Sequence, residues 1–126
     1  MWYDVNWLFV GAGGAAGAVF RFLLSRFVSQ KSNTTFPVGT FIVNISGALL
    51  LGVLTGANTG SNVYLLMGEG FLGAYTTFST LTFEGFGLFQ DGERRKALVY
   101  IAGTFLLGIA AYTAGFASVK WFKSFL

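Results

Sequence analysis

The sequence predicts an all-α membrane protein whose four transmembrane helices form a single domain. Composition is the first observation, because 54% of the 126 residues are hydrophobic and only 10% are charged, whereas a soluble domain carries about 25% charge. Length is the second, because four spans of roughly 20 residues with short turns use nearly the whole chain. The third is that residues 32–68 and 97–119 carry no charge. The predicted domain is 1–126, with spans at about 5–28, 37–57, 63–90 and 97–119.

The residue inventory excludes several classes of function. The chain has no histidine and no cysteine, so imidazole proton shuttles, thiol nucleophiles and His or Cys metal sites are excluded, and no enzyme activity is expected. The net charge of +3 is small and scattered, which leaves no basic surface for a nucleic acid. Residues 1–6 carry Asp4 and no basic side chain, so no signal peptide is expected and the first apolar run remains a span.

The first two spans are bounded by polar residues and turn formers. The first contains Arg21 and is predicted to end at the polar stretch 29–35. Pro37 suits the first turn of the second helix, because proline lacks the N–H that would be unsatisfied there. An uncharged run of turn-forming residues, 56–62, separates the second and third spans. This loop is expected to be short.

The third span is predicted to be broken near its centre. Residues 68–80 are rich in glycine and threonine within an otherwise apolar run, which makes a continuous helix doubtful. The charged residues 91–96 are expected to form a solvated turn after it. The fourth span ends at 120–123, where two lysines flank a tryptophan as at a membrane interface.

Small residues four apart predict close helix packing on three spans, because membrane helices associate through small residues and interhelical hydrogen bonds. The pairs are Gly13 and Gly17, Gly52 and Gly56, and Ala111 and Gly115. Residues 11–16 also match a relaxed dinucleotide-binding pattern, G-x-G-x-x-A. That interpretation is rejected, because the acid about 20 residues later and the alternating strands and helices that it requires are missing.

Four polar side chains inside apolar runs are candidates for function, because an ionised group in the bilayer costs several kcal/mol unless it faces protein or water. They are Arg21, Asn44, Glu69 and Glu84. Arg21 could instead extend to the interface, and Glu84 could pair with a basic residue at its end of the bundle. Asn44 lies near mid-membrane, where its amide suits either an anion or a neighbouring backbone.

A stripe of hydroxyl groups is predicted on the fourth span. Tyr100, Thr104 and Tyr112 recur at spacings of four or eight, so they lie on one helix face. Hydroxyl groups can replace water around a small anion. They can equally form hydrogen bonds between helices.

Three motifs give the chain a resemblance to a known family. They are GGAAGAVFRF at 13–22, PVGTFIVN at 37–44 and GFLGAYTTFST at 70–80. Together, and in this order on short spans, they resemble the small bacterial fluoride channels called Fluc or CrcB.

The resemblance implies a passive, fluoride-selective channel in the bacterial cell membrane that lets cytoplasmic fluoride leave. It also implies an antiparallel, dual-topology dimer with two pores and a structural sodium ion bound by backbone carbonyl groups, which Gly73 and Thr76 match. By the same resemblance, Asn44, Phe78, Tyr100 and Thr104 line the fluoride pathway. The full set of candidate pathway residues is Asn44, Phe78, Ser79, Thr80, Tyr100, Thr104, Arg21 and Glu84.

Three positions depart from the family pattern. Leu81 replaces a second pore phenylalanine and lacks its electropositive ring edge, while Phe83 is expected on a different face. Gly108 replaces the third hydroxyl residue of the fourth span, and Glu69 is an acid where a small or neutral residue is expected.

Three other functions are compatible with some of these features. A small multidrug exporter has the same size, four helices and dual topology, but it needs an acid in its first span, where this chain has Arg21. The chain could also be the non-conducting partner of a heterodimeric fluoride channel, or an assembly subunit that transports nothing.

Basic residues favour one orientation in the membrane. The first and third loops carry five of them, against two at the shared side of the termini. This bias favours those loops in the cytoplasm and is in tension with antiparallel self-pairing. A homodimer is still favoured, with a paralogous partner subunit as the alternative.

Overall fold

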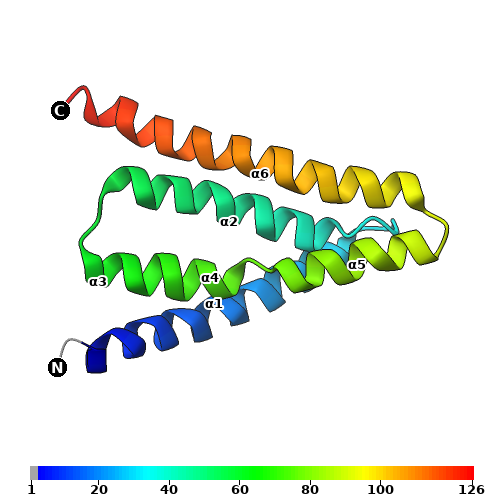
Figure 1. The fold of residues 1–126 in the computed structure, drawn as a ribbon, viewed down its shortest axis with the longest axis horizontal. Coiled ribbons are helices and arrows are strands. Elements are labelled where there is room, and N and C mark those ends of the chain that lie inside the picture. The colour runs from blue at the N-terminus through cyan, green and yellow to red at the C-terminus, as the bar shows by residue number, and fades with distance from the viewer. Residues whose placement is uncertain (1–2) are drawn as a thin grey trace.

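The computed structural model describes residues 3–126, which are helical apart from their turns (Figure 1). The elements are α1 (Tyr3–Lys31), α2 (Val38–Ala57), α3 (Ser61–Tyr64), the π-helix η1 (Leu65–Leu72), α4 (Gly73–Tyr75), α5 (Phe78–Gln90) and α6 (Arg94–Lys123). α3, η1 and α4 follow one another directly, so the third helix consists of residues 61–75 and, after a break, α5. The all-helical prediction is confirmed.

Three of the helices are long and apolar enough to cross a bilayer: Asn6–Lys31, Val38–Ala57 and Arg94–Lys123. The third predicted span reaches such a length only when its two halves are taken together. α1 and α6 extend a few residues past the predicted spans 5–28 and 97–119, because backbone hydrogen bonding continues where a helix leaves the apolar layer. The chain is a multi-pass membrane protein.

Turn chemistry ends the helices where the sequence predicts. α2 ends at Ala57, and the capping residue Asn58 adopts the left-handed conformation (φ 53°) and donates its N–H to the carbonyl of Thr55. Pro37 precedes α2 and accepts the first helical hydrogen bond from Phe41 N at 3.1 Å. Gly92 has φ +79° in the turn before α6, a conformation that favours glycine.

Glycine contacts hold α6 against α2. A Cβ atom on Gly52 would clash with the carbonyl oxygen of Tyr112, and one on Gly115 would clash with that of Leu49. The backbones therefore approach more closely than any side chain permits. This confirms the small-residue prediction for these two helices.

The same kind of contact joins α1 to the third helix. Cβ atoms on Gly13 and Gly17 would clash with the carbonyl oxygens of Leu66 and Phe71, respectively. α1 therefore packs along η1, while α2 lies between the third helix and α6 in the view of Figure 1.

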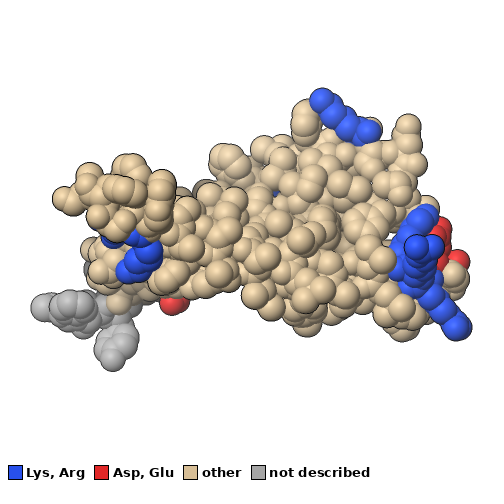
Figure 2. Space-filling view, turned by 90° about the horizontal axis from the view of Figure 1, so that it is seen from above, with Lys and Arg blue, Asp and Glu red and all other residues tan. Residues whose placement is uncertain are grey.

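Most of the remaining surface is apolar. The exposed fractions of Phe83 and Leu106 are 81% and 70%, which suits lipid rather than water. Charged groups gather instead at the two ends of the bundle (Figure 2), and both chain ends lie at the same end (Figure 1).

The turn predicted at 91–96 is shorter in the structure, because α6 begins at Arg94 and its first turn includes Lys96. Polar side chains join this turn to the loop between α1 and α2. Lys96 contacts Glu93 at 2.9 Å and donates to the hydroxyl of Thr35 at 2.7 Å. Thr35 in turn donates to Glu93 at 3.2 Å. The hydrogen bond from Lys96 is the main cause that lowers the pKa of Glu93.

Candidate functional site

The break in the third helix is an extended pair of threonines. α4 ends at Tyr75, Thr76 is extended (φ −77°, ψ 155°), and Thr77 is extended as well (φ −147°, ψ 118°) before α5 begins at Phe78. The predicted interruption is confirmed. Extended backbone survives inside a membrane only when its polar groups are satisfied by protein or line a cavity.

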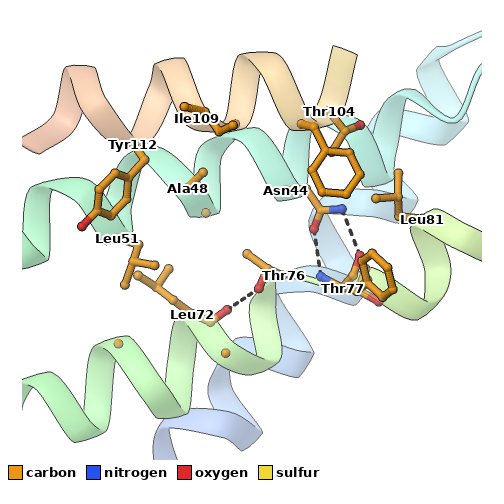
Figure 3. Close-up of a pocket in the computed structure, with 16 residues that line it drawn as sticks. Asn44, Ala48, Leu51, Leu72, Thr76, Thr77, Leu81, Thr104, Ile109 and Tyr112 are labelled. Carbon is orange, nitrogen blue, oxygen red and sulfur yellow. Dashed lines mark hydrogen bonds between the residues drawn. The ribbon is translucent and has the colours of Figure 1, made fainter. Parts of the chain in front are cut away.

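The side chain of Asn44 satisfies the backbone of the break. Its Oδ1 accepts a hydrogen bond from Thr77 N at 2.8 Å, and its Nδ2 donates to Thr77 O at 3.0 Å. Figure 3 shows both bonds between α2 and the broken helix. Of the two partners considered for this amide, an anion or a neighbouring backbone, the structure shows the backbone.

This arrangement frees carbonyl groups at the end of α4. In an uninterrupted helix, Thr77 N would bond to the carbonyl of Gly73, but it bonds to Asn44 instead. The backbone N–H and the hydroxyl of Thr76 both bond to Leu72 O, at 3.0 and 2.9 Å. Gly73 is exposed on the surface of the chain. Carbonyl oxygens are the ligands that a hard cation requires, so these residues fit the sodium site that the resemblance implies.

Thr77 also caps α5. Its Oγ1 accepts a hydrogen bond from Thr80 N at 3.2 Å and donates to the hydroxyl of Thr80 at 2.9 Å. The Ser79 hydroxyl lies 3.4 Å from the Thr77 hydroxyl. Thr77 was missed as a site residue, although a threonine three residues before another polar side chain is a signal for a helix start.

An open groove of about 480 Å³ lies between α2, the broken helix and α6 (Figure 3). Its wall includes Asn44, Phe78 and Thr104 from the candidate pathway, and Gly73 and Thr76 from the candidate sodium site. The Phe78 side chain is 68% exposed. The groove therefore brings together five of the residues selected from the sequence.

Glu84 and Tyr100 form a second cluster, with Thr40. Tyr100 is fully buried and its hydroxyl donates to Glu84 Oε2 at 2.8 Å, while the Thr40 hydroxyl donates to Glu84 Oε1 at 3.1 Å. Thr104 donates to the carbonyl of Tyr100 at 2.6 Å. Glu84 thus has hydroxyl partners rather than the basic partner considered from the sequence, and the stripe on α6 forms bonds within the chain. Thr40 was missed.

Arg21 borders a smaller cavity of about 290 Å³ between α1, α2 and α5. Its polar wall includes Ser25, Thr40 and Thr80 besides the half-buried Arg21. Thr77 borders both this cavity and the groove. Both spaces therefore reach the break at Thr77.

Two of the three departures from the family pattern touch the groove, and the third, Glu69, is exposed in η1 outside the groove lining. Leu81 is 4% exposed and packs in a core cluster with Leu88 and Tyr100, although it also touches the groove. Gly108 lines the groove and presents no hydroxyl there. Phe83 is 81% exposed and lies outside the groove lining, so it does not replace a phenylalanine at Leu81.

Fold and site together define a small multi-pass membrane protein. One of its helices is broken at mid-span, and polar groups near the break face a groove. A family model described as "CrcB-like protein, Camphor Resistance (CrcB)" matches residues 8–116. The chain belongs to the CrcB family.

Curated relatives carry a functional name. The chain is 50% identical over 106 residues to "Fluoride-specific ion channel FluC 2" of Moorella thermoacetica, covering 82% of this chain and 87% of the relative. It is 41% identical over 111 residues to the protein of that name from Clostridium acetobutylicum, covering 88% and 95%. It is 43% identical over 116 residues to "Fluoride-specific ion channel FluC" of Hydrogenobaculum sp., covering 88% and 94%.

Proposed function

We propose that this chain is a subunit of a fluoride-specific ion channel through which cytoplasmic fluoride leaves a bacterial cell passively. The observation that carries the proposal is the groove at the helix break, where Asn44, Phe78 and Thr104 meet. The names of the relatives at 41% to 50% identity support the choice of ion.

The groove supplies the donors that a permeating anion requires. A channel must replace the hydration shell of the ion, and the Asn44 amide has a second Nδ2 hydrogen beside the one donated to Thr77 O. The electropositive edge of the Phe78 ring can face an anion. The hydroxyl of Tyr100 donates to Glu84, and that of Thr104 donates to the carbonyl of Tyr100. Both join the pathway by rotating these hydroxyl hydrogens toward the permeating anion.

The second copy of the chain is part of the proposal. The exposed residues on the broken helix include Glu69 and Gly73, and a carboxylate or an unpaired backbone group is unfavourable against lipid. A second copy in antiparallel orientation covers this face, because a two-fold axis brings the same surface of each chain together. A paralogous subunit would cover it in the same way.

A sodium ion completes the assembly. It binds to main-chain oxygens of Gly73 and Thr76 at the end of α4, where the broken hydrogen-bonding ladder leaves carbonyl groups free. The negative end of a helix dipole favours a cation at such a position.

A multidrug exporter is the second candidate function, because such exporters have a similar size and topology. Its cation chemistry requires an acid in the first span, whereas Arg21 borders the polar cavity on α1. A positive side chain there favours an anion instead.

Fluoride efflux from proteoliposomes, with chloride as the control ion, tests the function. The wild-type chain is expected to release fluoride and to retain chloride. Asn44→Ala and Phe78→Ile are expected to abolish or sharply slow the fluoride flux while the dimer persists. Wild-type flux in both variants would remove these residues from the pathway, and no fluoride flux from the wild-type chain, alone or with a paralogous subunit, would overturn the proposed function.

A further inference from the structure

Glu69 is an acid that the proposed pathway does not use. It lies in η1, seven residues before the break, and its side chain is exposed. At the rise of a helix this position is about 10 Å from the break, inside an apolar layer whose half-thickness is about 15 Å. An ionisable group at that depth indicates a function.

The packing of its neighbours fixes the face on which Glu69 lies. Gly68 is buried against Leu54 of α2, and Gly70 is buried against Val10 of α1. Glu69 lies between them in sequence and is covered by neither helix. It therefore shares the uncovered side of the third helix.

Gly73 lies on the same side. It is exposed, and it follows Glu69 by four residues, so the two are neighbours on one helix face, separated along the axis by about 6 Å or less. The π-helical turns, in which Gly73 N donates to the carbonyl of Gly68, keep residues four apart close to alignment. The carboxylate is thus the nearest acidic group along the chain to the carbonyl of Gly73.

We propose that Glu69 sets the affinity of the central cation site, by attracting sodium toward the carbonyl oxygens of Gly73 and Thr76. This inference rests on the sodium site of the proposed function. Because helical side chains lean toward the N-terminus and carbonyl groups point toward the C-terminus, the carboxylate and the carbonyl oxygen of Gly73 are further apart than the axial spacing, at about 10 Å. Two unit charges at that separation, at an effective dielectric constant of about 20, attract strongly enough to change affinity roughly tenfold. In a two-fold assembly each copy contributes one carboxylate, so the cation also offsets the repulsion between them.

A sodium titration of thermal stability tests the proposal. The purified full-length protein is unfolded at increasing sodium chloride, with N-methyl-D-glucamine chloride keeping the ionic strength constant. Glu69→Gln is expected to raise the sodium concentration at half-maximal stabilisation at least roughly tenfold. Asp91→Asn is the matched control, because Asp91 is an exposed acid in the turn after α5 and its loss is expected to leave the midpoint unchanged.

The outcomes separate this inference from the proposed function. A wild-type protein whose unfolding temperature ignores sodium would overturn the sodium site itself. If sodium stabilises the wild type and Glu69→Gln has the same sodium midpoint, only the role of Glu69 would be overturned. If Glu69→Gln assembles poorly, rescue by high sodium supports the proposal, and failure to assemble at every sodium concentration would contradict it. Glu69→Asp keeps the charge and is expected to stay near the wild-type midpoint.

Discussion

Asn44 is the residue on which the break depends most directly. A helix that stops at mid-membrane leaves an N–H and a carbonyl group unpaired, each costing several kcal/mol in lipid. The Asn44 amide pairs with both groups of Thr77, at 2.8 and 3.0 Å. One side chain on α2 thus allows the third helix to end and restart. The Asn44 amide, which lines the groove, has one further N–H to donate.

The first prediction, also at the residue scale, concerns the hydrogen bond from Tyr100 to Glu84. Tyr100→Phe removes the donor to Glu84 Oε2, which leaves a half-buried carboxylate with Thr40 as its remaining partner in this cluster. The variant is expected to lose about 1–3 kcal/mol of stability and to lower fluoride flux. Thermal unfolding and liposome flux measure the two effects.

Tyr112→Phe provides the control for stability, because Tyr112 lies about three turns further along α6, on the groove wall. Equal unfolding temperatures for Tyr100→Phe and Tyr112→Phe would show that the bond to Glu84 does not stabilise the fold.

At the scale of elements, the break leaves carbonyl groups of the third helix without their helical partners. Neighbouring helices approach each other closely because their contacts are glycines. Gly17 on α1 and Gly52 on α2 face backbone carbonyl groups of other helices. These contacts set α1 beside the first half of the third helix and α2 beside α6.

The second prediction concerns the proposed sodium site, whose proposed ligands are main-chain oxygens. Thr76→Val removes a hydroxyl that bonds to Leu72 O within the helix and leaves the backbone carbonyl in place. The sodium midpoint of thermal stabilisation is expected to stay within about threefold of the wild type, well under the tenfold loss that the removal of a direct ligand would cause. A larger loss would assign the side chain to the metal.

Close packing of α2 on α6 gives the third prediction. A Cβ atom on Gly52 would overlap the carbonyl oxygen of Tyr112, so Gly52→Ala must separate the helices and is expected to destabilise the protein by about 1–3 kcal/mol. Gly11→Ala is the matched control on α1, since nothing lies within 4 Å of a Cβ atom there. Gly52→Ala is expected to unfold at a lower temperature than Gly11→Ala. Equal unfolding temperatures would contradict the packing argument.

At the scale of the whole molecule, both termini lie at one end of the bundle (Figure 1), and basic side chains gather at both ends (Figure 2). The loops opposite the termini carry the larger number of basic residues. The positive-inside rule therefore favours one orientation, whereas antiparallel self-pairing requires both.

Cysteine labelling gives the fourth prediction. The chain contains no cysteine, so a single Ser32→Cys substitution, in the loop after α1, reports orientation alone. Labelling from both sides of the membrane is expected for an antiparallel homodimer. Labelling from one side, together with fluoride flux only when a second subunit is co-expressed, would rule out the homodimer and support the paralogous partner.

The sequence by itself determined the number and order of the helices, the break in the third and the small-residue contacts. These features follow from composition, local turn chemistry and residue size, which act over a few neighbouring positions. The prediction of a break at 68–80 succeeded because glycine and threonine weaken a helix wherever they cluster.

Only the tertiary structure decided which polar groups meet. Asn44 bonds to a residue 33 positions away, and Glu84 bonds to residues 16 and 44 positions away. Local pattern carries no information on such pairs, because they depend on how the glycine contacts set one helix against another. For the same reason the sequence identified Glu69 as unusual, while packing left it, like Gly73, exposed on the third helix.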